Sequence, residues 1–243
     1  MADPVDALKE NMADIKRLLA LHTAEAGATR GRKYDVEVLN KSGVVLALAC
    51  WEAFVEDCAT AAFDFVRDNA ASGTSVAEPV RRFVANRVRE DKNELAPWAM
   101  SDQGWKLVLG QYRDAVLKKY VSPLNTPSAE NVDALFFELV GIPRVSDAWQ
   151  RVKMNPAAAR GRLKAVIKLR GAIAHRTKAT RAVRKDDVRE AAELVDTLAS
   201  ITSNQVRAHV FGLVGKYPWQ AQPDPPRAGR KPGVVATAGA PTG

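Results

Sequence analysis

The chain has 243 residues, of which 47% are hydrophobic and 26% charged, the balance of a globular domain with one good-sized core. No stretch reaches the roughly 18 uncharged apolar residues that a membrane span needs, and the N-terminus lacks the basic start and apolar run of a secretory signal. We therefore expect a cytoplasmic protein with no membrane partner. The net charge of +8 instead favours a polyanionic partner, with nucleic acid the commonest choice.

Metal and cofactor signatures are absent from the sequence. Cys50 and Cys58 lie on one predicted helix, about 12 Å apart along its axis, which is too far for a disulfide. We expect both to be reduced core residues. No Cys/His cluster has zinc spacing, and the HExxH, EF-hand, Walker and GxGxxG patterns are missing. The sequence therefore predicts neither a metal site nor a cofactor.

Apolar residues recur every three or four positions in several segments, as in amphipathic α-helices. The first such segment runs from Val5 to Leu21, and residues 27–35 form a polar connection. The second, from Val38 to Asn69, is apolar on most sides, so we expect it to be the central helix. Further helices are expected from Pro79 through Val88, from Gly104 to Val121, over AENVDALFFELVG, from about Ala157, and from Asp186 to about Val214. Because no segment alternates like a strand, the sequence predicts an all-α helical bundle.

The segment from Tyr217 to Gly243 is rich in Pro, Gly and Ala and has no apolar periodicity. We expect it to be flexible. The predicted organisation is an N-terminal helix and linker over residues 1–35, a helical domain over 36–215, and a disordered tail over 216–243.

The positive charge is concentrated in one part of the chain. Between Arg160 and Arg189 there are eleven lysines and arginines against only Asp186 and Asp187, a local charge of +9. The rest of the chain therefore sums to −1. A solvated basic surface is the simpler interpretation of such a run, but its overlap with the motif described next favours a functional role.

Arg170 and His175 lie within this basic segment, at the close of an apolar-periodic helix. An arginine can neutralise a phosphate while an imidazole moves a proton near neutral pH. On an unbroken helix the two side chains would point about 140° apart. They converge only if the helix ends or distorts around Gly171–Ala174, or if a second chain supplies one of them. A purely structural alternative has His175 capping the helix and Arg170 paired with Glu52, a carboxylate beside Trp51 in the central helix.

The same residues carry a resemblance to the HEPN superfamily, whose hallmark is Arg, four to six residues, then His. LRGAIAHR around Arg170 and His175 resembles the LRNxIAHG of the RiboL-PSP HEPN branch. ALACWEAFVEDC at 47–58 resembles the early helix of that branch, and LNTPSAENVDALFFELVGI at 124–142 resembles the segment before its motif helix. The resemblance covers roughly residues 36–205. It implies a helical bundle that dimerises, so that two Arg/His pairs line one basic cleft.

The resemblance implies a metal-independent endoribonuclease, of the kind that serves as a toxin or an antiphage effector. RNA supplies its own 2′-hydroxyl as the nucleophile, which gives a 2′,3′-cyclic phosphate and a free 5′-hydroxyl. In this role Arg170 stabilises the transition state, His175 acts as general base or acid, and Glu52 orients one of them. The RNA backbone is then held by Arg176, Lys178 and Arg181. The expected partners are RNA, a second copy of the chain, and an antitoxin or regulatory protein.

Two other functions stay open. The first is a non-catalytic HEPN module that binds RNA or a partner protein, which is favoured by Gly171 because the family commonly has a polar Asn at that position. The second is a helical interaction domain without any nucleic-acid role. Trp98, Trp105 and Trp149 could stack on bases, although aromatic residues among Leu and Val more often belong to the core.

Overall fold

The computed structural model describes residues 3–26, 36–102, 104–121, 127–174 and 182–223, and every structural statement below concerns these ranges. They hold seven α-helices and three short 3-10 helices, η1 (Gly73–Ser75), η2 (Trp98–Met100) and η3 (Val145–Ala148). No β-strand occurs in these ranges. The all-α prediction is therefore confirmed. In chain order the α-helices are α1 (Pro4–Ala26), α2 (Glu37–Asn69), α3 (Glu78–Glu90), α4 (Gly104–Val121), α5 (Ala129–Val140), α6 (Pro156–Ala174) and α7 (Lys185–Val214).

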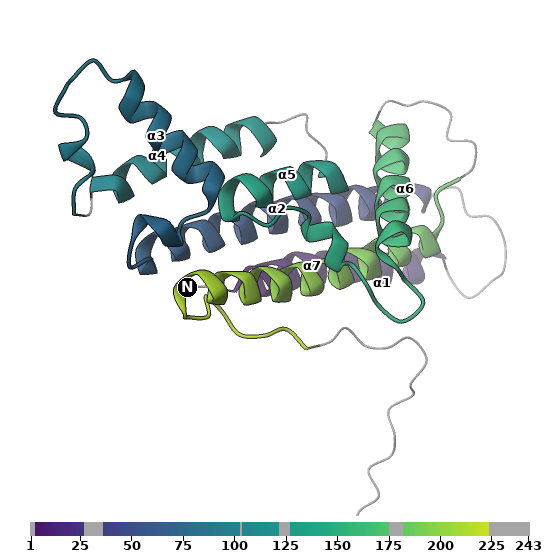
Figure 1. The fold of residues 1–243 in the computed structure, drawn as a ribbon. Helices are drawn as coiled ribbons and strands as arrows, with labels where there is room; N and C mark the ends of the chain where they lie inside the picture. Colours follow the sequence, from purple (N-terminus) through teal and green to yellow (C-terminus); the bar gives the residue numbers. More distant parts are fainter. Residues whose placement is uncertain (1–2, 27–35, 103, 122–126, 175–181, 224–243) are drawn as a thin grey trace, which may run out of the picture.

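Helix α2 is the centre of the bundle (Figure 1). Helices α1 and α7 run along it, α5 packs against it, and α6 crosses the bundle at one end. Helices α3 and α4 form an arm toward the other end. The N-terminal helix shares the common core, because its residues Val5, Leu8 and Ile15 are buried together with those of α2 and α7.

The central position of α2 follows from its apolar surface, as predicted. Leu48, Cys50 and Trp51 are all buried, and at about 100° per residue Leu48 and Cys50 lie on nearly opposite sides of the helix. Gly43 lets α7 approach closely, since a Cβ built at this position would lie 2.6 Å from Cγ1 of Val188. Burial on several faces is what distinguishes a core helix from an amphipathic surface helix.

Among the described residues, α2 is also the one helix that is long and apolar enough to cross a membrane. Half of its apolar window is buried against the rest of the protein, in contact with α1, α5, α6 and α7. The length and apolar composition of α2 are therefore those of the core helix of this bundle. The expectation that the chain has no membrane partner stays a prediction.

Several helix ends lie where the sequence predicts them, whereas α1 continues to Ala26, beyond the predicted end at Leu21. Oδ1 of Asp3 accepts a hydrogen bond from the backbone N–H of Val5 at 2.9 Å, and Pro79 lies in the first turn of α3. Ser128 caps α5 by accepting from the N–H of Asn131 at 3.3 Å. Gly141 ends α5 at φ +79°, a left-handed conformation that glycine adopts without strain.

The start of the C-terminal segment differs from the prediction. Residues 217–223 were expected to be flexible and to lie in a disordered tail that starts at residue 216, but they pack as a strap along α7. Trp219 is 6% exposed and donates from Nε1 to Oγ of Ser203 at 2.8 Å. The Gln222 side chain donates to Oδ2 of Asp3 at 2.6 Å, which ties the strap to the start of α1. One buried tryptophan and a few side-chain hydrogen bonds thus order a segment without any periodic pattern. Residues 224–243 lie outside the described residues.

Candidate nucleic-acid interface

The helix that carries Arg170 is built on a well-fixed base. The side chain of Asn155 caps α6 by accepting from the N–H of Ala158 at 2.8 Å, and Pro156 suits the first helical position. Ala159 and Leu163 are buried against the bundle. These contacts attach the first half of α6 to α2, α5 and α7.

The segment before α6 is anchored by Trp149, which is completely buried. Its indole N–H donates to Oγ1 of Thr202 on α7 at 2.9 Å, and its ring meets Trp51 of α2 edge-on at 5.8 Å between centroids. Trp51 in turn donates to the carbonyl of Pro127, just before α5, at 3.1 Å. Two tryptophans therefore fix α2, α7, the start of α5 and the entry to α6 relative to one another.

A polar network adds a second attachment. Asp133 of α5 accepts from both the N–H and the hydroxyl of the buried Ser146, at 2.8 and 2.7 Å. Arg160 of α6 donates from Nε to the same hydroxyl at 2.8 Å and forms an ion pair with Asp147. Arg160 is thereby used to hold α6 in place. No local pattern in the sequence predicts this network, because its members come from three separate elements.

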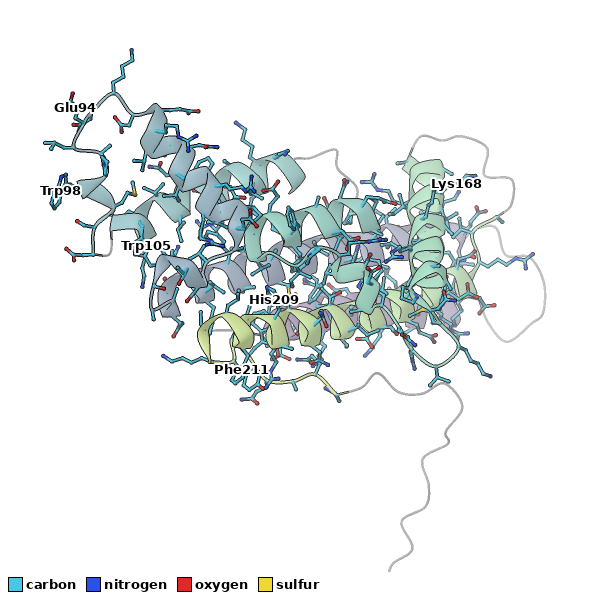
Figure 2. All side chains as sticks on the ribbon, in the orientation of Figure 1. Glu94, Trp98, Trp105, Lys168, His209 and Phe211 are labelled. Carbon is cyan, nitrogen blue, oxygen red and sulfur yellow. The ribbon has the colours of Figure 1, made fainter. Side chains whose placement is uncertain are left out.

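The remaining cations of α6 are exposed. The helix carries five arginines and lysines and no acidic residue. Apart from Arg160, all of them are exposed: Arg162, Lys164, Lys168 and Arg170. Within the described ranges none of these four forms an ion pair. Figure 2 places Lys168 on α6, at the opposite end of the molecule from Trp98. The surface of α6 is therefore a run of free positive charges suited to a polyanion.

The charge of this surface also reaches α5. Glu130, in the first turn of α5, has a pKa below its usual value, mainly because of hydrogen bonds with its own backbone and with Ser128. The positive charges of Lys164 and Arg160 lower it further. Lys164 and Lys168 belong to the basic segment evident in the sequence, but they were not predicted as site residues. The complete absence of acidic residues from α6 was the signal that could have identified them.

Arg170 is exposed at the far end of α6. It follows the buried Leu163 by seven positions, so it lies on the same face of the helix. Its exposure shows that the core no longer covers this face two turns after Leu163. The helix continues through Gly171–Ala174. The described residues therefore show no distortion there, while an end of the helix after Ala174 and a second chain stay as predicted ways to bring Arg170 and His175 together.

Glu52 lies on α2 and is half-buried. It makes no hydrogen bond or ion pair with the described part of the chain, so the pairing with Arg170 considered as a structural alternative is not observed. Its charge acts on Glu56 one turn later. Burial raises the pKa of Glu56, and the neighbouring charges of Asp57 and Glu52 raise it further. The proposed role of Glu52 toward His175 stays a prediction.

The other predicted site residues, His175, Arg176, Lys178 and Arg181, lie outside the described residues. The three tryptophans considered as base-stacking residues differ from one another: Trp149 is core, Trp105 is half-buried, and Trp98 is 75% exposed. Trp149 and Trp105, which packs against the core, fit the expectation of core residues, whereas Trp98 does not. Cys50 and Cys58 are buried free thiols, as predicted, and burial raises the pKa of both.

Comparison with known proteins identifies the family. No curated protein and no solved structure matches the chain. The family model described as RiboL-PSP-HEPN matches residues 7–208, from the first helix through most of α7. This match points to a nuclease or an RNA-binding module. The chain belongs to the RiboL-PSP-HEPN family, which confirms the resemblance carried by the segment around Arg170 and His175.

Proposed function

We propose that the protein is a metal-independent endoribonuclease whose site lies around Arg170 and His175. The single observation that carries this proposal is the surface of α6, where three exposed cations, Arg162, Lys164 and Lys168, lead to the exposed Arg170 on a helix that contains no acidic residue. A phosphodiester chain is the polyanion that such a surface suits. Family membership supports the same choice.

The proposed reaction needs no group beyond the protein and the RNA. His175 accepts the proton of a 2′-hydroxyl, and the 2′-oxygen attacks the adjacent phosphorus. Arg170 stabilises the extra negative charge of the phosphorane-like transition state. The bond from phosphorus to the 5′-oxygen then breaks, and that oxygen takes a proton from an imidazolium. The products are a 2′,3′-cyclic phosphate and a 5′-hydroxyl, while Arg176, Lys178 and Arg181 hold the RNA backbone and Glu52 orients a motif residue.

A second copy of the chain completes the proposed site. Arg170 and His175 would diverge if the helix continued past Ala174, where the described part of α6 ends. The face of α6 that buries Leu163 is uncovered at Arg170. Pairing two copies through this end of α6 would place Arg170 of one copy beside His175 of the other. The proposal therefore includes a homodimer.

The test is cleavage of RNA by the purified protein in EDTA. Wild type should cleave, whereas Arg170→Ala and His175→Ala should lose about two to four orders of magnitude in rate. Arg17→Ala is a matched control, because Arg17 is an exposed arginine on α1 with only a surface ion pair. Absence of cleavage by the wild-type protein, or full activity of His175→Ala, would contradict the mechanism.

A non-catalytic module that binds RNA or a partner protein is the second candidate. Gly171 favours it, since a polar side chain that could support the motif is missing there, and the space around it is open. This function predicts RNA binding that weakens steeply with salt but no turnover. Replacing Lys168 by Gln should lower the slope of log affinity against log salt by about one under either function. Turnover therefore separates the two. An endoribonuclease that is always active endangers its own cell. The proposed enzyme would therefore need a partner protein that inhibits it, as a toxin or an antiphage effector does.

A further inference from the structure

A cavity of about 640 Å³ opens between α3, α4 and α5. It lies on the side of the α3–α4 arm, away from α6 (Figure 1). One aromatic ring from each of the three helices lines it: Phe83, Tyr112 and Phe137. Its volume is that of pockets that bind a small molecule or a large side chain. It shares no residue with the surface of α6, so the inference below is independent of the proposed function.

The cavity combines aromatic walls with a fixed carboxylate. The rings of Phe83 and Tyr112 are 4.7 Å apart between centroids, at an interplanar angle of 45°. The hydroxyl of Tyr112 donates to Oε2 of Glu138 at 2.7 Å, which holds this carboxylate at the wall. Phe137 is 42% exposed, whereas its neighbour Phe136 is completely buried. An exposed phenylalanine that lines a cavity is typical of a binding surface.

We propose that this cavity binds an arginine side chain of a partner protein. A guanidinium is flat, so it can stack on the faces of Phe83 and Phe137, where the electron density of the ring attracts a cation. Its N–H groups need acceptors at the edges of the stack. Glu138 supplies a carboxylate, and Asn86, which also lines the cavity, supplies an amide oxygen.

The rim of the cavity already holds one guanidinium. Arg82 and Glu78, both lining residues, form an ion pair at 2.6 Å. The lining therefore holds two carboxylates, those of Glu78 and Glu138, and one guanidinium. This excess of carboxylates favours a cation over a phosphate-bearing ligand such as a nucleotide.

The exposed surface of the α3–α4 arm, whose helices line the cavity, indicates that the arginine belongs to a protein. Leu95, Trp98 and Leu107 are 65%, 75% and 80% exposed on the same α3–α4 arm. Figure 2 shows Trp98 at the end of this arm. Exposed apolar residues on the same arm as an anchoring pocket are typical of protein interfaces, in which Trp and Arg contribute much of the affinity. A partner docked here leaves α6 open to RNA.

The test titrates the full-length protein with the peptide acetyl-Gly-Arg-Gly-amide and follows backbone amide resonances by NMR. The same peptide with citrulline is the matched probe, because citrulline keeps the shape of arginine without its charge. We expect the arginine peptide to shift resonances of the lining residues and to bind roughly tenfold more tightly than the citrulline peptide. Equal affinity for the two peptides, or no response to arginine, would overturn the proposal.

Two variants locate the binding. Glu138→Gln keeps an acceptor for Tyr112 but removes the charge, and Phe137→Leu removes an exposed ring; each should weaken arginine binding roughly tenfold. Phe211→Leu is the control, because Phe211 is equally exposed, at 42%, but lies on α7. Unchanged affinity in both test variants contradicts the proposal. Adenosine is added as a third probe, and adenosine binding at these resonances without an arginine response would also overturn it, in favour of a base pocket.

Discussion

Replacing Trp149 by phenylalanine should lower the free energy of unfolding by about 3 kcal/mol. The indole is completely buried, and phenylalanine lacks its pyrrole part. Loss of that buried surface, equivalent to two or three methylene groups, costs about 2 kcal/mol. The lost hydrogen bond also leaves the buried hydroxyl of Thr202 without its indole partner, which adds about 1 kcal/mol. The edge-on contact with Trp51 is partly kept, since phenylalanine presents a similar ring edge.

Trp98→Phe is the matched control, because the same chemical change is made at a side chain that is 75% exposed. It should alter the unfolding free energy by less than about 0.5 kcal/mol. Urea denaturation followed by circular dichroism measures both variants, and the shift in midpoint at an unchanged slope gives the difference in stability. Equal effects of the two substitutions, or a loss below about 1 kcal/mol for Trp149→Phe, would refute the position assigned to Trp149 at the base of α6.

Four further substitutions test other parts of the structure. Gly43→Ala should lower the free energy of unfolding by about 1–2 kcal/mol, because the new Cβ would lie 2.6 Å from Val188. Gly171→Ala should raise it by about 0.5–1 kcal/mol, because the space around Gly171 is open and alanine favours the helix. A gain in thermal stability from Gly43→Ala would contradict the close packing of α2 on α7. Trp219→Ala should lower the free energy of unfolding, measured by urea denaturation, by about 3–4 kcal/mol, because Trp219 packs the strap against α7. A change near zero would contradict this packing. Glu56→Gln should raise the melting temperature at neutral pH, because the raised folded-state pKa of Glu56 makes its ionised form destabilising. That penalty is present above the folded-state pKa and fades as the pH falls toward the unfolded value of 4.5, so the advantage of the glutamine should shrink on acidification; a constant advantage would be inconsistent with this origin.

The helices could be predicted from sequence because local signals mark them. The predicted helix from Gly104 to Val121 has these same bounds in the structure, and Ser128 and Gly141 bracket α5 as their chemistry requires. The central place of α2 followed from apolar residues on most of its sides. These features depend on residues close together in the chain, so periodicity and capping were enough to find them.

The features that were missed depend on distant contacts. The strap is ordered by Trp219 against Ser203, which no local pattern encodes. Trp149 and Trp98 look alike in sequence, yet one is completely buried and the other is 75% exposed. Likewise, the basic segment was evident from charge alone, but only the fold shows that Arg160 holds α6 in place, while the other cations of the helix are exposed and form no ion pair with the described part of the chain. Residue type indicates what a side chain can do, and the tertiary structure decides which ability is used.

The candidate site was located by the same combination of local and distant information. The spacing of Arg170 and His175 identified the motif, and the structure adds that Arg170 is exposed and unpaired within the described ranges. It also removes the ion pair with Glu52 as a structural explanation for Arg170. The arginine is thus available to a ligand, as the proposed function requires.

The most direct measurement of the central claim compares an RNA oligonucleotide with the same sequence carrying a single 2′-deoxy nucleotide at the cleaved position. Both are incubated with the wild-type protein in EDTA, and the ends of the products are identified by mass spectrometry. The account predicts that the RNA is cut to a 2′,3′-cyclic phosphate and a 5′-hydroxyl, while the substituted oligonucleotide stays intact at that position. Cleavage at the deoxy position, or loss of all cleavage in EDTA, would contradict it.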